Sequence, residues 1–513
     1  MSREQRKEHE VVGGGPAPPP PRKQAGLLLD EPLIFERSRP GRRGFAVPGG
    51  AEDPSTFLPT ELLREPIAGF PEVSEPEVLR HFLRLSQWNL GTATTFYPLG
   101  SCTMKYNPVA NEVVARLPGF AGLHPLVPDD GAQGALELIW ELERMLAEIS
   151  GMDAVSLQPA AGAQGELTGM KMIRAYHVDH GRARRKVLIP ASAHGTNPAS
   201  AALCGYSTVQ VEGNRIGLIE AAAVRRAMDD DVAALMITNP NTLGLFEREI
   251  VQVAEVVHER GGLVYLDGAN LNALMGVAKP AHMGADVMQI NLHKTFSTPH
   301  GGGGPGAGPV AVREVLVPYL PTPRLVRDGE RLRWSEDVPK SIGRVRSSHG
   351  NFGMLVRAHA YILALGGDGL TQATRMAVLS ANYIRRRLED AYQLAFPGTC
   401  MHECVFSDKG FEATGVKTLD IAKRLLDHGF YAPTIYFPLV VSGALMIEPT
   451  ETESKETLDE FIDAMLSIAH EARETPDVVR NAPTQTPIGR LDEARAARRP
   501  VLRWTPPASS TSV

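Results

Sequence analysis

LVYLDGAN at residues 263–270 and VMQINLHKTF at residues 287–296 are the stretches that decide the fold of this chain. Asp267 stands at the end of the apolar run in the first stretch, and Lys294 follows the run in the second. Short apolar runs of this kind are typical of strands buried on both faces of a parallel sheet. The interval between Asp267 and Lys294 has room for one helix and one strand. The two side chains are therefore predicted at neighbouring strand ends.

Further runs of the same kind extend this pattern along the chain. Apolar residues at helical spacing predict an amphipathic helix over 135–149 and another helix over 249–260. Strands that alternate with helices favour an α/β fold with a mostly parallel sheet, in which ligands bind beyond the carboxyl ends of the strands. The predicted strands are 186–190, 232–238, 263–267 and 287–292.

Polar and glycine residues follow the predicted strands. His194 comes after the first strand, and Asn239 and Thr242 come after the second. Upstream, Gly162, Ala163 and Gln164 open a predicted helix. An acid, a lysine, a histidine and a glycine-rich helix entrance are thus predicted at one edge of the sheet.

Pyridoxal phosphate (PLP) requires these groups. Lys294 could form the Schiff base, and Asp267 could hold a proton on the pyridine nitrogen through a hydrogen bond of about 1.5–3 kcal/mol. His194 is the candidate for stacking on the ring. The turn at 161–166 offers backbone N–H groups and a helix dipole to the phosphate, and the glycines at 301–304 allow close backbone approach to a ligand.

Each of these residues also has an ordinary structural interpretation. A lysine after a strand is usually a surface lysine, and an aspartate at a strand end often caps a helix. A single histidine is usually a structural residue whose hydrogen bonds are satisfied. Their occurrence together, in this order and at these strand ends, favours the PLP interpretation.

Composition limits the function classes. The chain has 513 residues, of which 43% are hydrophobic and 22% charged, so two or more domains are expected. The net charge of −6 argues against nucleic acid as a partner. No apolar run approaches the roughly 20 residues that cross a membrane. The N-terminal residues carry charges of both signs and lack a secretory signal, so a cytoplasmic location is expected.

The cysteines predict neither a disulfide scaffold nor a metal site. Four cysteines are too few for such a scaffold in a chain of this size. Cys400, His402 and Cys404 alternate in sequence and are expected on one face of a strand. Three potential ligands this close together, with no fourth in view, are weak evidence for metal binding.

Several longer blocks carry a family resemblance. The most specific is FYPLGSCTMKYNP at 96–108. The blocks span roughly residues 30 to 465 and, with the segments quoted above, resemble the P protein of the glycine cleavage system, glycine dehydrogenase (decarboxylating), in particular its lysine-bearing half, subunit 2. The other blocks are PLIFE at 32–36, SRPGRR at 38–43, GRVR at 343–346, MHECVF at 401–406 and MIEPTETE at 446–453.

The resemblance implies a fold-type I PLP enzyme, like aspartate aminotransferase, with a large α/β domain and a smaller C-terminal α/β domain. It implies PLP bound covalently at Lys294, with Asp267 on the pyridine nitrogen and His194 against the ring. The expected cofactor-binding set is completed by Gly162, Ala163, Gln164, Asn239, Thr242 and His293. Asn239 and Thr242 are expected to contact the phenolic oxygen of the cofactor or to orient His194.

The resemblance also implies an activity and partners. The family decarboxylates glycine, releases CO2 and transfers the aminomethyl group to the lipoyl group of the H protein. The chain is too short to hold both halves of a P protein, so a sister subunit 1 is expected, in an α2β2 assembly. The loop that contains Ser101, Thr103 and Lys105 either contacts substrate or packs under the cofactor as a structural loop.

Alternative functions remain open from sequence. Another fold-type I enzyme, such as an aminotransferase or a different amino-acid decarboxylase, would share the lysine and the aspartate. A noncatalytic scaffold of the same family would not need Lys294. The expected division of the chain is a flexible arm at 1–32, an N-terminal extension that packs on the core at 33–115, a large PLP-binding domain at 116–345, a small C-terminal domain at 346–480 and a tail at 481–513.

Overall fold

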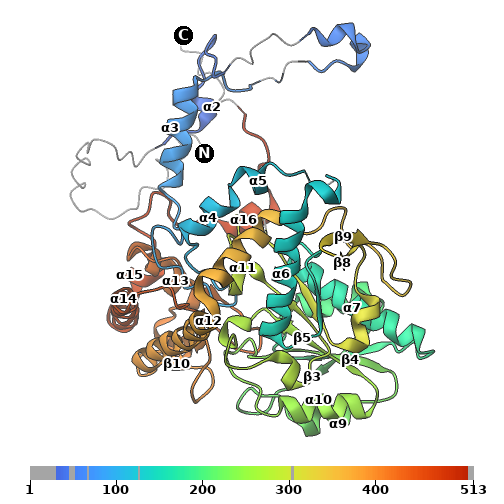
Figure 1. The fold of residues 1–513 in the computed structure, drawn as a ribbon. Coiled ribbons are helices and arrows are strands. Elements are labelled where there is room, and N and C mark those ends of the chain that lie inside the picture. The colour runs from blue at the N-terminus through green and yellow to red at the C-terminus, as the bar shows by residue number, and fades with distance from the viewer. Residues whose placement is uncertain are drawn as a thin grey trace, which may run out of the picture. The chain divides into compact units, whose positions relative to one another are not determined.

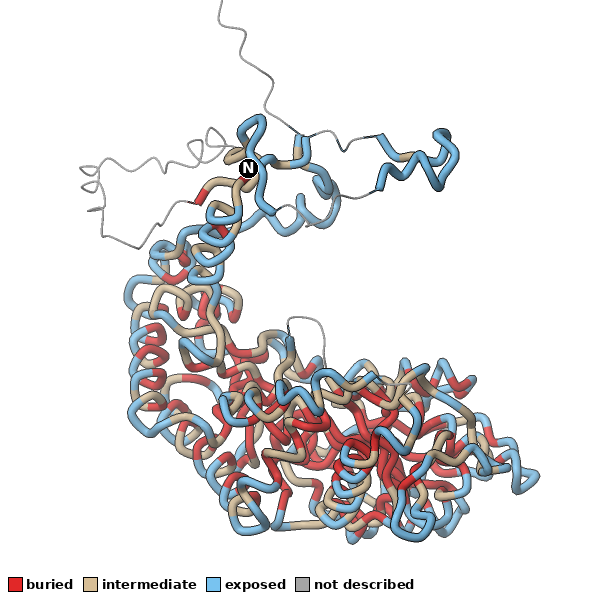
Figure 2. Tube along the Cα trace, turned by 45° about the horizontal axis from the view of Figure 1, so that its top comes forward, coloured by how far each residue is buried: buried red, intermediate tan, exposed pale blue. Residues whose placement is uncertain are grey.

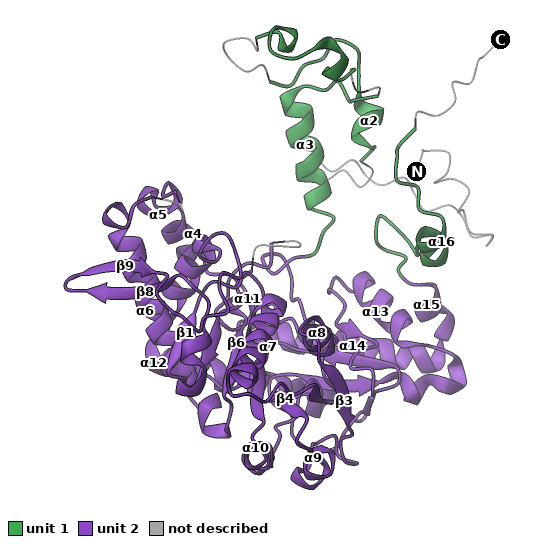
Figure 3. Ribbon diagram, turned by 90° about the vertical axis from the view of Figure 1, so that its right-hand side faces the viewer, with its two compact units in different colours: residues 1–90, 483–513 green, residues 91–482 purple. Residues whose placement is uncertain are grey.

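The computed structural model describes residues 31–45, 52–65, 67, 69–124, 127–301 and 306–505. Most of the predicted N-terminal arm, the glycines at 302–304 and the last eight residues of the predicted tail lie outside these residues. The chain divides into two compact units, residues 1–90 with 483–513 and residues 91–482 (Figure 3).

A seven-stranded sheet forms the centre of the larger unit, in the order β1-β7-β6-β5-β4-β2-β3 (Figure 1). Strands β2 to β6 are parallel, and β7 pairs antiparallel with both of its neighbours. This confirms the predicted α/β class with a mostly parallel sheet. The strands are β1 (Ala154–Ser156), β2 (Lys186–Pro190), β3 (Ser207–Val211), β4 (Val232–Thr238), β5 (Leu263–Gly268), β6 (Val287–Ile290) and β7 (Val310–Val312).

Helices cover both faces of this sheet because successive side chains of each strand point to opposite faces. In β5, Val264 and Leu266 pack with α6, α10 and α12, whereas Tyr265 packs with α7 and α8. Buried residues accordingly concentrate between the sheet and its helices (Figure 2). The helices of this layer are α6 (Gln133–Ser150), α7 (Gly162–Asp179), α8 (Thr196–Leu203), α9 (Ala221–Ala227), α10 (Ile250–Glu259) and α12 (Phe352–Leu388).

A second, four-stranded antiparallel sheet lies in the C-terminal part of the same unit, in the order β10-β11-β13-β12. Its core includes Phe406, Phe461 and the C-terminal end of α12. Gly366 (φ 61°) interrupts the helical geometry of α12 near its middle. The elements are β10 (Gln393–Leu394), β11 (Cys404–Ser407), β12 (Thr434–Ile435), β13 (Ala444–Ile447), α13 (Thr418–Asp427), α14 (Lys455–Glu474) and α15 (Pro476–Asn481).

Smaller elements complete the larger unit. The hairpin of β8 (Arg324–Asp328) and β9 (Arg331–Ser335) packs on α6 through Gln133, which exchanges hydrogen bonds with the backbone of Leu332. The remaining helices are α4 (Val109–Ala115), α5 (Pro118–Ala121) and α11 (Leu292–Thr295).

The smaller unit contains α2 (Ile34–Arg37), α3 (Glu75–Ser86) and α16 (Glu493–Arg498). The buried carboxylate of Glu31 forms ion pairs with Arg37 at 2.7 Å and Arg84 at 3.3 Å and lies 2.8 Å from the ring of His81. Among the described residues of both units, no helix is both long and apolar enough to cross a membrane.

Two local expectations are wrong. Strand β6 ends at Ile290, and Leu292 already begins α11, so Lys294 lies in a one-turn helix. Cys400, His402 and Cys404 do not share a strand. Strand β11 begins only at Cys404, and Cys400 and His402 lie in the connection that leads to it. Alternation over so few residues did not distinguish a strand from an extended connection.

Candidate active site

Asp267 lies at the carboxyl end of β5 and is 3% exposed. Its Oδ2 accepts a hydrogen bond from Asn197 Nδ2 at 3.0 Å, and its Oδ1 accepts one from the backbone N–H of Ala269 at 3.0 Å. Gln289, its cross-strand neighbour on β6, also donates to Oδ1. These three donors fix the carboxylate at the edge of the sheet.

Lys294 lies one strand away, in α11 after β6, and is half-buried. Its Nζ forms no hydrogen bond or ion pair with any residue that the structure describes. Its positive charge nevertheless acts on the groups around it. Burial lowers the pKa of His194, and the charge of Lys294 lowers that pKa further. An unpaired amine that is surrounded by titratable side chains is a candidate reactive group.

His194 follows β2 and is exposed, yet enough protein surrounds its ring that desolvation lowers its pKa. Its Nδ1 lies 2.8 Å from Thr196 Oγ1, and its ring meets that of Phe437 edge-on at 5.8 Å. Asp267 counteracts the lowering of this pKa, as expected for a nearby carboxylate. His194 therefore lies within electrostatic reach of both Asp267 and Lys294 at this edge of the sheet, although β4 separates β2 from β5.

Helix α7 begins at Gly162, as predicted, and its first turn faces the same edge. The side chain of Gln164 holds this turn, since it accepts from Ala160 N and donates to Val345 O, both at 2.7 Å. A Cβ on Gly162 would lie 2.3 Å from Asn291 Nδ2, and one on Gly308 would lie 2.0 Å from the backbone oxygen of Ala161. The backbone packs closely here, and the first-turn N–H groups of Gly162, Ala163 and Gln164 have no acceptors within the helix.

Several buried polar atoms at this edge have no hydrogen-bond partner among the described residues. They lie at the last residue of β4, just after β5 and β6, or in α8 and α11. Buried polar groups are normally paired, so a concentration of orphan atoms points to a polar ligand. The atoms are Asn197 Oδ1, Thr238 Oγ1, Asn270 Oδ1, Asn291 Oδ1 and Thr295 Oγ1.

Three predicted cofactor residues have other contacts. Asn239 Oδ1 accepts from Glu247 N at 2.9 Å within its own turn, and its side chain does not bond to His194. The hydroxyl of Thr242 donates to the backbone oxygen of Ser192, in the loop that carries His194. The ring of His293 lies edge-on to that of His300 at 5.1 Å, and burial lowers the pKa of His293 to about 3.

The loop at 101–107 reaches the segment that follows Lys294. Lys105 is buried, forms an ion pair with Glu451 at 2.6 Å and donates to the backbone oxygen of Thr295 at 2.9 Å. Asn107 donates to Ser297 O at 2.9 Å. With its amine already paired, Lys105 braces the Lys294 turn in this structure.

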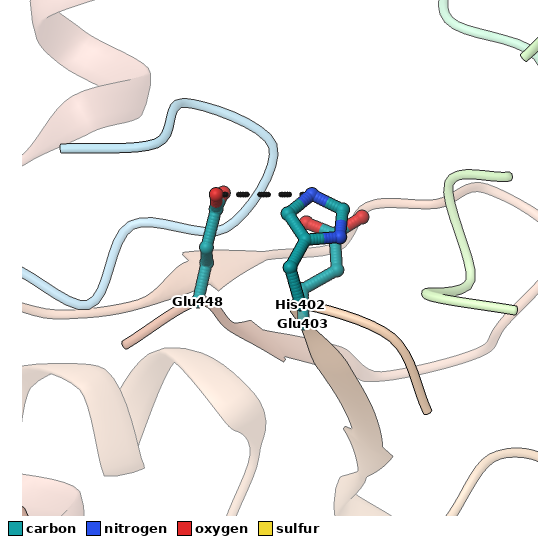
Figure 4. Close-up of side chains that lie close together, drawn as sticks. All are labelled: His402, Glu403 and Glu448. Carbon is teal, nitrogen blue, oxygen red and sulfur yellow. Dashed lines mark ion pairs between the residues drawn. The ribbon is translucent and has the colours of Figure 1, made fainter. Parts of the chain in front are cut away.

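Ser101 and Thr103, in the same loop, contact two buried carboxylates. The N–H of Ser101 donates to Glu403 Oε2 at 2.8 Å. Thr103 donates to Glu448 through its N–H at 3.0 Å and through its hydroxyl at 2.5 Å. Polar atoms of His402, Glu403 and Glu448 lie within 4.8 Å of one another (Figure 4). This cluster was missed in the sequence because the pairing of two distant strands creates it.

Glu166 is a third carboxylate, besides Glu403 and Glu448, that sequence reasoning missed. It accepts from Thr196 Oγ1 at 2.8 Å and from Asn197 Nδ2 at 3.1 Å, so Asn197 bridges Glu166 and Asp267. Burial, together with the charge of Asp267, raises the pKa of Glu166 to about 7. The only sequence signal was an acidic residue on the otherwise apolar face of a glycine-rich helix entrance.

Known protein families match most of the chain. The model of the "Glycine cleavage system P-protein" matches residues 55–330, and that of "Glycine dehydrogenase, C-terminal domain" matches residues 373–486. A protein of Listeria monocytogenes serotype 4a, named "Probable glycine dehydrogenase (decarboxylating) subunit 2", is 56% identical over 92% of this chain and 98% of its own length. A protein of the same name from Halalkalibacterium halodurans is 57% identical over 93% of this chain and 98% of its own length.

Solved structures of similar fold include a glycine decarboxylase (P-protein) of the glycine cleavage system in inhibitor-bound form. It has a TM-score of 0.68 and 22% identity, and the match covers 80% of this chain and 94% of that one. A cysteine desulfurase from Thermococcus onnurineus has a TM-score of 0.57 and 15% identity, over 73% of this chain and 95% of that one. These likenesses confirm the predicted fold class, and the sequence matches show that the chain belongs to the glycine cleavage system P-protein family.

Proposed function

We propose that this chain is the lysine-bearing subunit of a two-subunit glycine decarboxylase. It would bind PLP covalently at Lys294, remove CO2 from glycine and transfer the remaining aminomethyl group to the lipoyl group of an H protein. The relatives named glycine dehydrogenase (decarboxylating) subunit 2 support the substrate and the reaction. The observation that carries the proposal is the unpaired Nζ of Lys294 beside the fixed carboxylate of Asp267.

The residues at the sheet edge fit PLP. Lys294 offers a free amine. Asp267 is held by neutral N–H donors, so its carboxylate remains available to a pyridine nitrogen. The first turn of α7 offers unpaired N–H groups to a phosphate. The orphan atoms around these groups fit a polar ligand that carries both acceptors and donors: the threonine hydroxyls can donate to phosphate oxygens, and the asparagine oxygens can accept from an O–H or N–H group.

Each residue would have a defined task. When bound, PLP supplies a sink for the electrons that the departing carboxylate leaves behind. Asp267 would keep the proton on the pyridine nitrogen, on which that capacity depends. His194, with its lowered pKa, would cover the ring as a neutral imidazole that adds no positive charge. Lys105 and Asn107 would hold the turn that carries Lys294.

The transfer step requires a second protein. One lipoyl sulfur forms a bond to the aminomethyl carbon, and the S–S bond breaks. The other sulfur, which stays on the lipoyl chain, takes up a proton and becomes a thiol. The relatives are named subunit 2, which supports the existence of a sister subunit 1. We place this subunit in an α2β2 heterotetramer with the present chain. Lys294 argues against a purely noncatalytic scaffold.

Exchange of labelled bicarbonate into the carboxyl group of glycine tests this proposal. The assay contains the purified chain, PLP and lipoylated H protein, with or without the sister subunit. Exchange that requires the sister subunit is the expected result. Exchange by this chain alone would refute the need for a partner. No exchange in either mixture, with PLP bound and an authentic partner present, would overturn the reaction.

A further inference from the structure

Oxygen atoms of Glu403 and Glu448 come within 4.8 Å of each other at neighbouring strands of the small sheet. Cys404 on β11 pairs with Ile447 on β13, so the residues just beyond this pair, Glu403 and Glu448, lie opposite each other at the end of the ladder. Both side chains are 0% exposed. Like charges directly across an antiparallel pair are destabilising, and burial increases this effect. The pair therefore requires compensation.

One loop supplies that compensation. Both oxygens of Glu448 accept hydrogen bonds from Thr103, whereas Glu403 accepts only from Ser101 N, at its Oε2. Ser101 and Thr103 have left-handed backbone geometry, with φ of 63° and 48°. Such geometry in residues other than glycine persists where surrounding contacts hold it, and here it accompanies the N–H groups that bond to the two carboxylates.

The donors are distributed unequally, which indicates where the charge resides. Glu403 Oε1 is buried and has no hydrogen-bond partner among the residues that the structure describes. Burial and the charge of Glu448 raise the pKa of Glu403 well above its usual value. Burial also raises the pKa of Glu448, to about 7, but Thr103, Lys294 and Lys105 oppose that rise. The less solvated carboxyl, Glu403, is therefore the one that retains a proton.

The other titratable groups around the pair agree with this assignment. Both ring nitrogens of His402 are buried and have no hydrogen-bond partner in the described part of the chain, and Nε2 lies 3.7 Å from Glu448 Oε1 (Figure 4). Burial lowers the pKa of His402 to about 3, so this ring adds no positive charge at neutral pH. Burial raises the pKa of the Cys102 thiol, and Cys400 disfavours ionisation of Glu403. The cations that act on the pair are Lys105 and Lys294.

We propose that Glu403 and Glu448 are a positioning pair, with one proton on Glu403 and the negative charge on Glu448, which holds the loop at 101–105 against the Lys294 turn. The same loop bonds to Thr295 O through Lys105 and to His300 through the backbone oxygen of Cys102. It thus connects the small sheet to the segment around Lys294. The assignment of the proton to Glu403 does not depend on the proposed function, whereas the importance of the pair for turnover rests on it.

Three variants test the pair: Glu403→Gln, Glu448→Gln and, as a matched control, Glu453→Gln. Glu453 lies in the segment that follows Glu448, and burial alone raises its pKa. Glutamine resembles a protonated glutamate, so E403Q should keep the Tm of the PLP-free chain within a few degrees of wild type. E448Q removes the charge, and its Tm should fall by several degrees more than that of E453Q.

Infrared spectra of the PLP-free chain, recorded at a pH well above the pKa of about 7 of Glu448, locate the proton. The difference spectrum of wild type minus E403Q should contain the C=O absorption of one protonated carboxyl. With PLP bound, E448Q should lower the pH midpoint of the absorbance change of the lysine-bound cofactor, because a nearby negative charge is lost. E403Q should leave that midpoint unchanged. Glycine exchange should fall at least about tenfold in E448Q, the loss expected for a buried charged hydrogen-bond acceptor.

Several results would overturn the proposal. Equal damage from E403Q and E448Q, the reverse order of damage, no carboxyl absorption in the difference spectrum, or a stoichiometric metal ion in the purified chain would each contradict it. The stability and infrared measurements need neither PLP nor glycine. If the wild-type chain fails to bind PLP or to exchange bicarbonate, the proposed function fails while these two measurements still decide the protonation of the pair.

Discussion

At the scale of residues, Lys294 differs from Lys105, the other lysine of the candidate site, because its amine has no partner among the described residues. The amine of Lys105 forms an ion pair with Glu451 and donates a hydrogen bond to Thr295 O. Nearby, Glu166 and Glu448 have raised pKa values because they are buried. A free amine among groups of perturbed pKa is the arrangement expected of a reactive centre.

Replacing Lys294 by alanine should abolish the visible absorbance of the lysine-bound cofactor. Activity should fall by on the order of 10⁴-fold or more, as for other residues of covalent catalysis. The Tm of the PLP-free chain should stay unchanged, because Nζ has no partner to lose. Lys455→Ala, at a lysine with an exposed side chain, is the control. Glycine–bicarbonate exchange at wild-type rate in K294A would contradict the assignment.

Replacing Lys105 by methionine should destabilise the PLP-free chain. The substitution leaves the carboxylate of Glu451 without its partner in a buried ion pair, a loss of roughly 3–5 kcal/mol. The double variant K105M/E451Q should recover part of that loss, since no unpaired charge remains. Urea unfolding of the three proteins measures the free energies. A double variant as unstable as K105M would show that the ion pair is not the cause.

At the scale of elements, the start of α7 and the connection that precedes β7 pack closely. The helix could be located in the sequence because glycines and a polar turn precede an apolar segment. The need for glycine at position 308 could not be predicted from the sequence, because it depends on contact with Ala161, which is far away in sequence. This packing fixes the N–H groups that we assign to the phosphate.

Gly308→Ala should weaken PLP binding. Its Cβ would lie 2.0 Å from Ala161 O, so the start of α7 must move. Overpacking of this kind costs about 1–3 kcal/mol, and we expect the Kd for PLP to rise at least about tenfold. Gly134→Ala, in the first turn of α6 where a Cβ meets no atom within 4 Å, is the control. Equal affinities of the two variants in an absorbance titration would argue against this role.

Helix α6 carries a separate pH-dependent contribution at Glu143. Burial raises the pKa of this carboxyl from 4.5 to about 8 in the folded chain. Its protonated form therefore favours folding, and that stability is lost as the pH rises from the unfolded to the folded value. Glu143→Gln should match the Tm of wild type below pH 4.5 and exceed it increasingly up to about pH 8. A constant difference in Tm across this range would contradict the assignment.

The periodic parts of the fold were predictable from sequence. Strands β2 and β4 have the predicted bounds, and α6 and α10 agree with their predicted ranges to within two residues. The end of β6 was not predictable, because Leu292 continues the apolar run although the backbone turns into α11. The set of His194, Asp267 and Lys294 was visible because all three lie at or just after the carboxyl ends of apolar runs. Glu403 and Glu448 instead depend on a register that only the folded chain reveals.

At the scale of the whole molecule, the smaller unit exposes several large apolar side chains. On α3, Leu79, Phe82 and Leu83 are 59%, 56% and 54% exposed and recur at the spacing of one helix face. Contiguous apolar surface in a folded protein usually marks an interaction site. This exposure agrees with our proposal that the chain functions with a sister subunit.

Co-expression with the sister subunit should yield a stable complex of two copies of each chain. Light scattering after size exclusion measures its mass, to which each copy of this chain contributes 55.5 kDa. The separated chain should bind an apolar dye more strongly than the complex, because apolar surface is covered on assembly. A fully active, dye-silent chain without its partner would refute the two-subunit arrangement.

Borohydride reduction of the PLP-loaded chain, followed by peptide mass spectrometry, tests the central claim most directly. The reduction makes the cofactor–lysine bond permanent, so the modified residue can be identified. Our account predicts one pyridoxyl group per chain, on the peptide that contains Lys294, and none on Lys105. A pyridoxyl group on another lysine, or bound PLP that leaves no covalent mark, would contradict it.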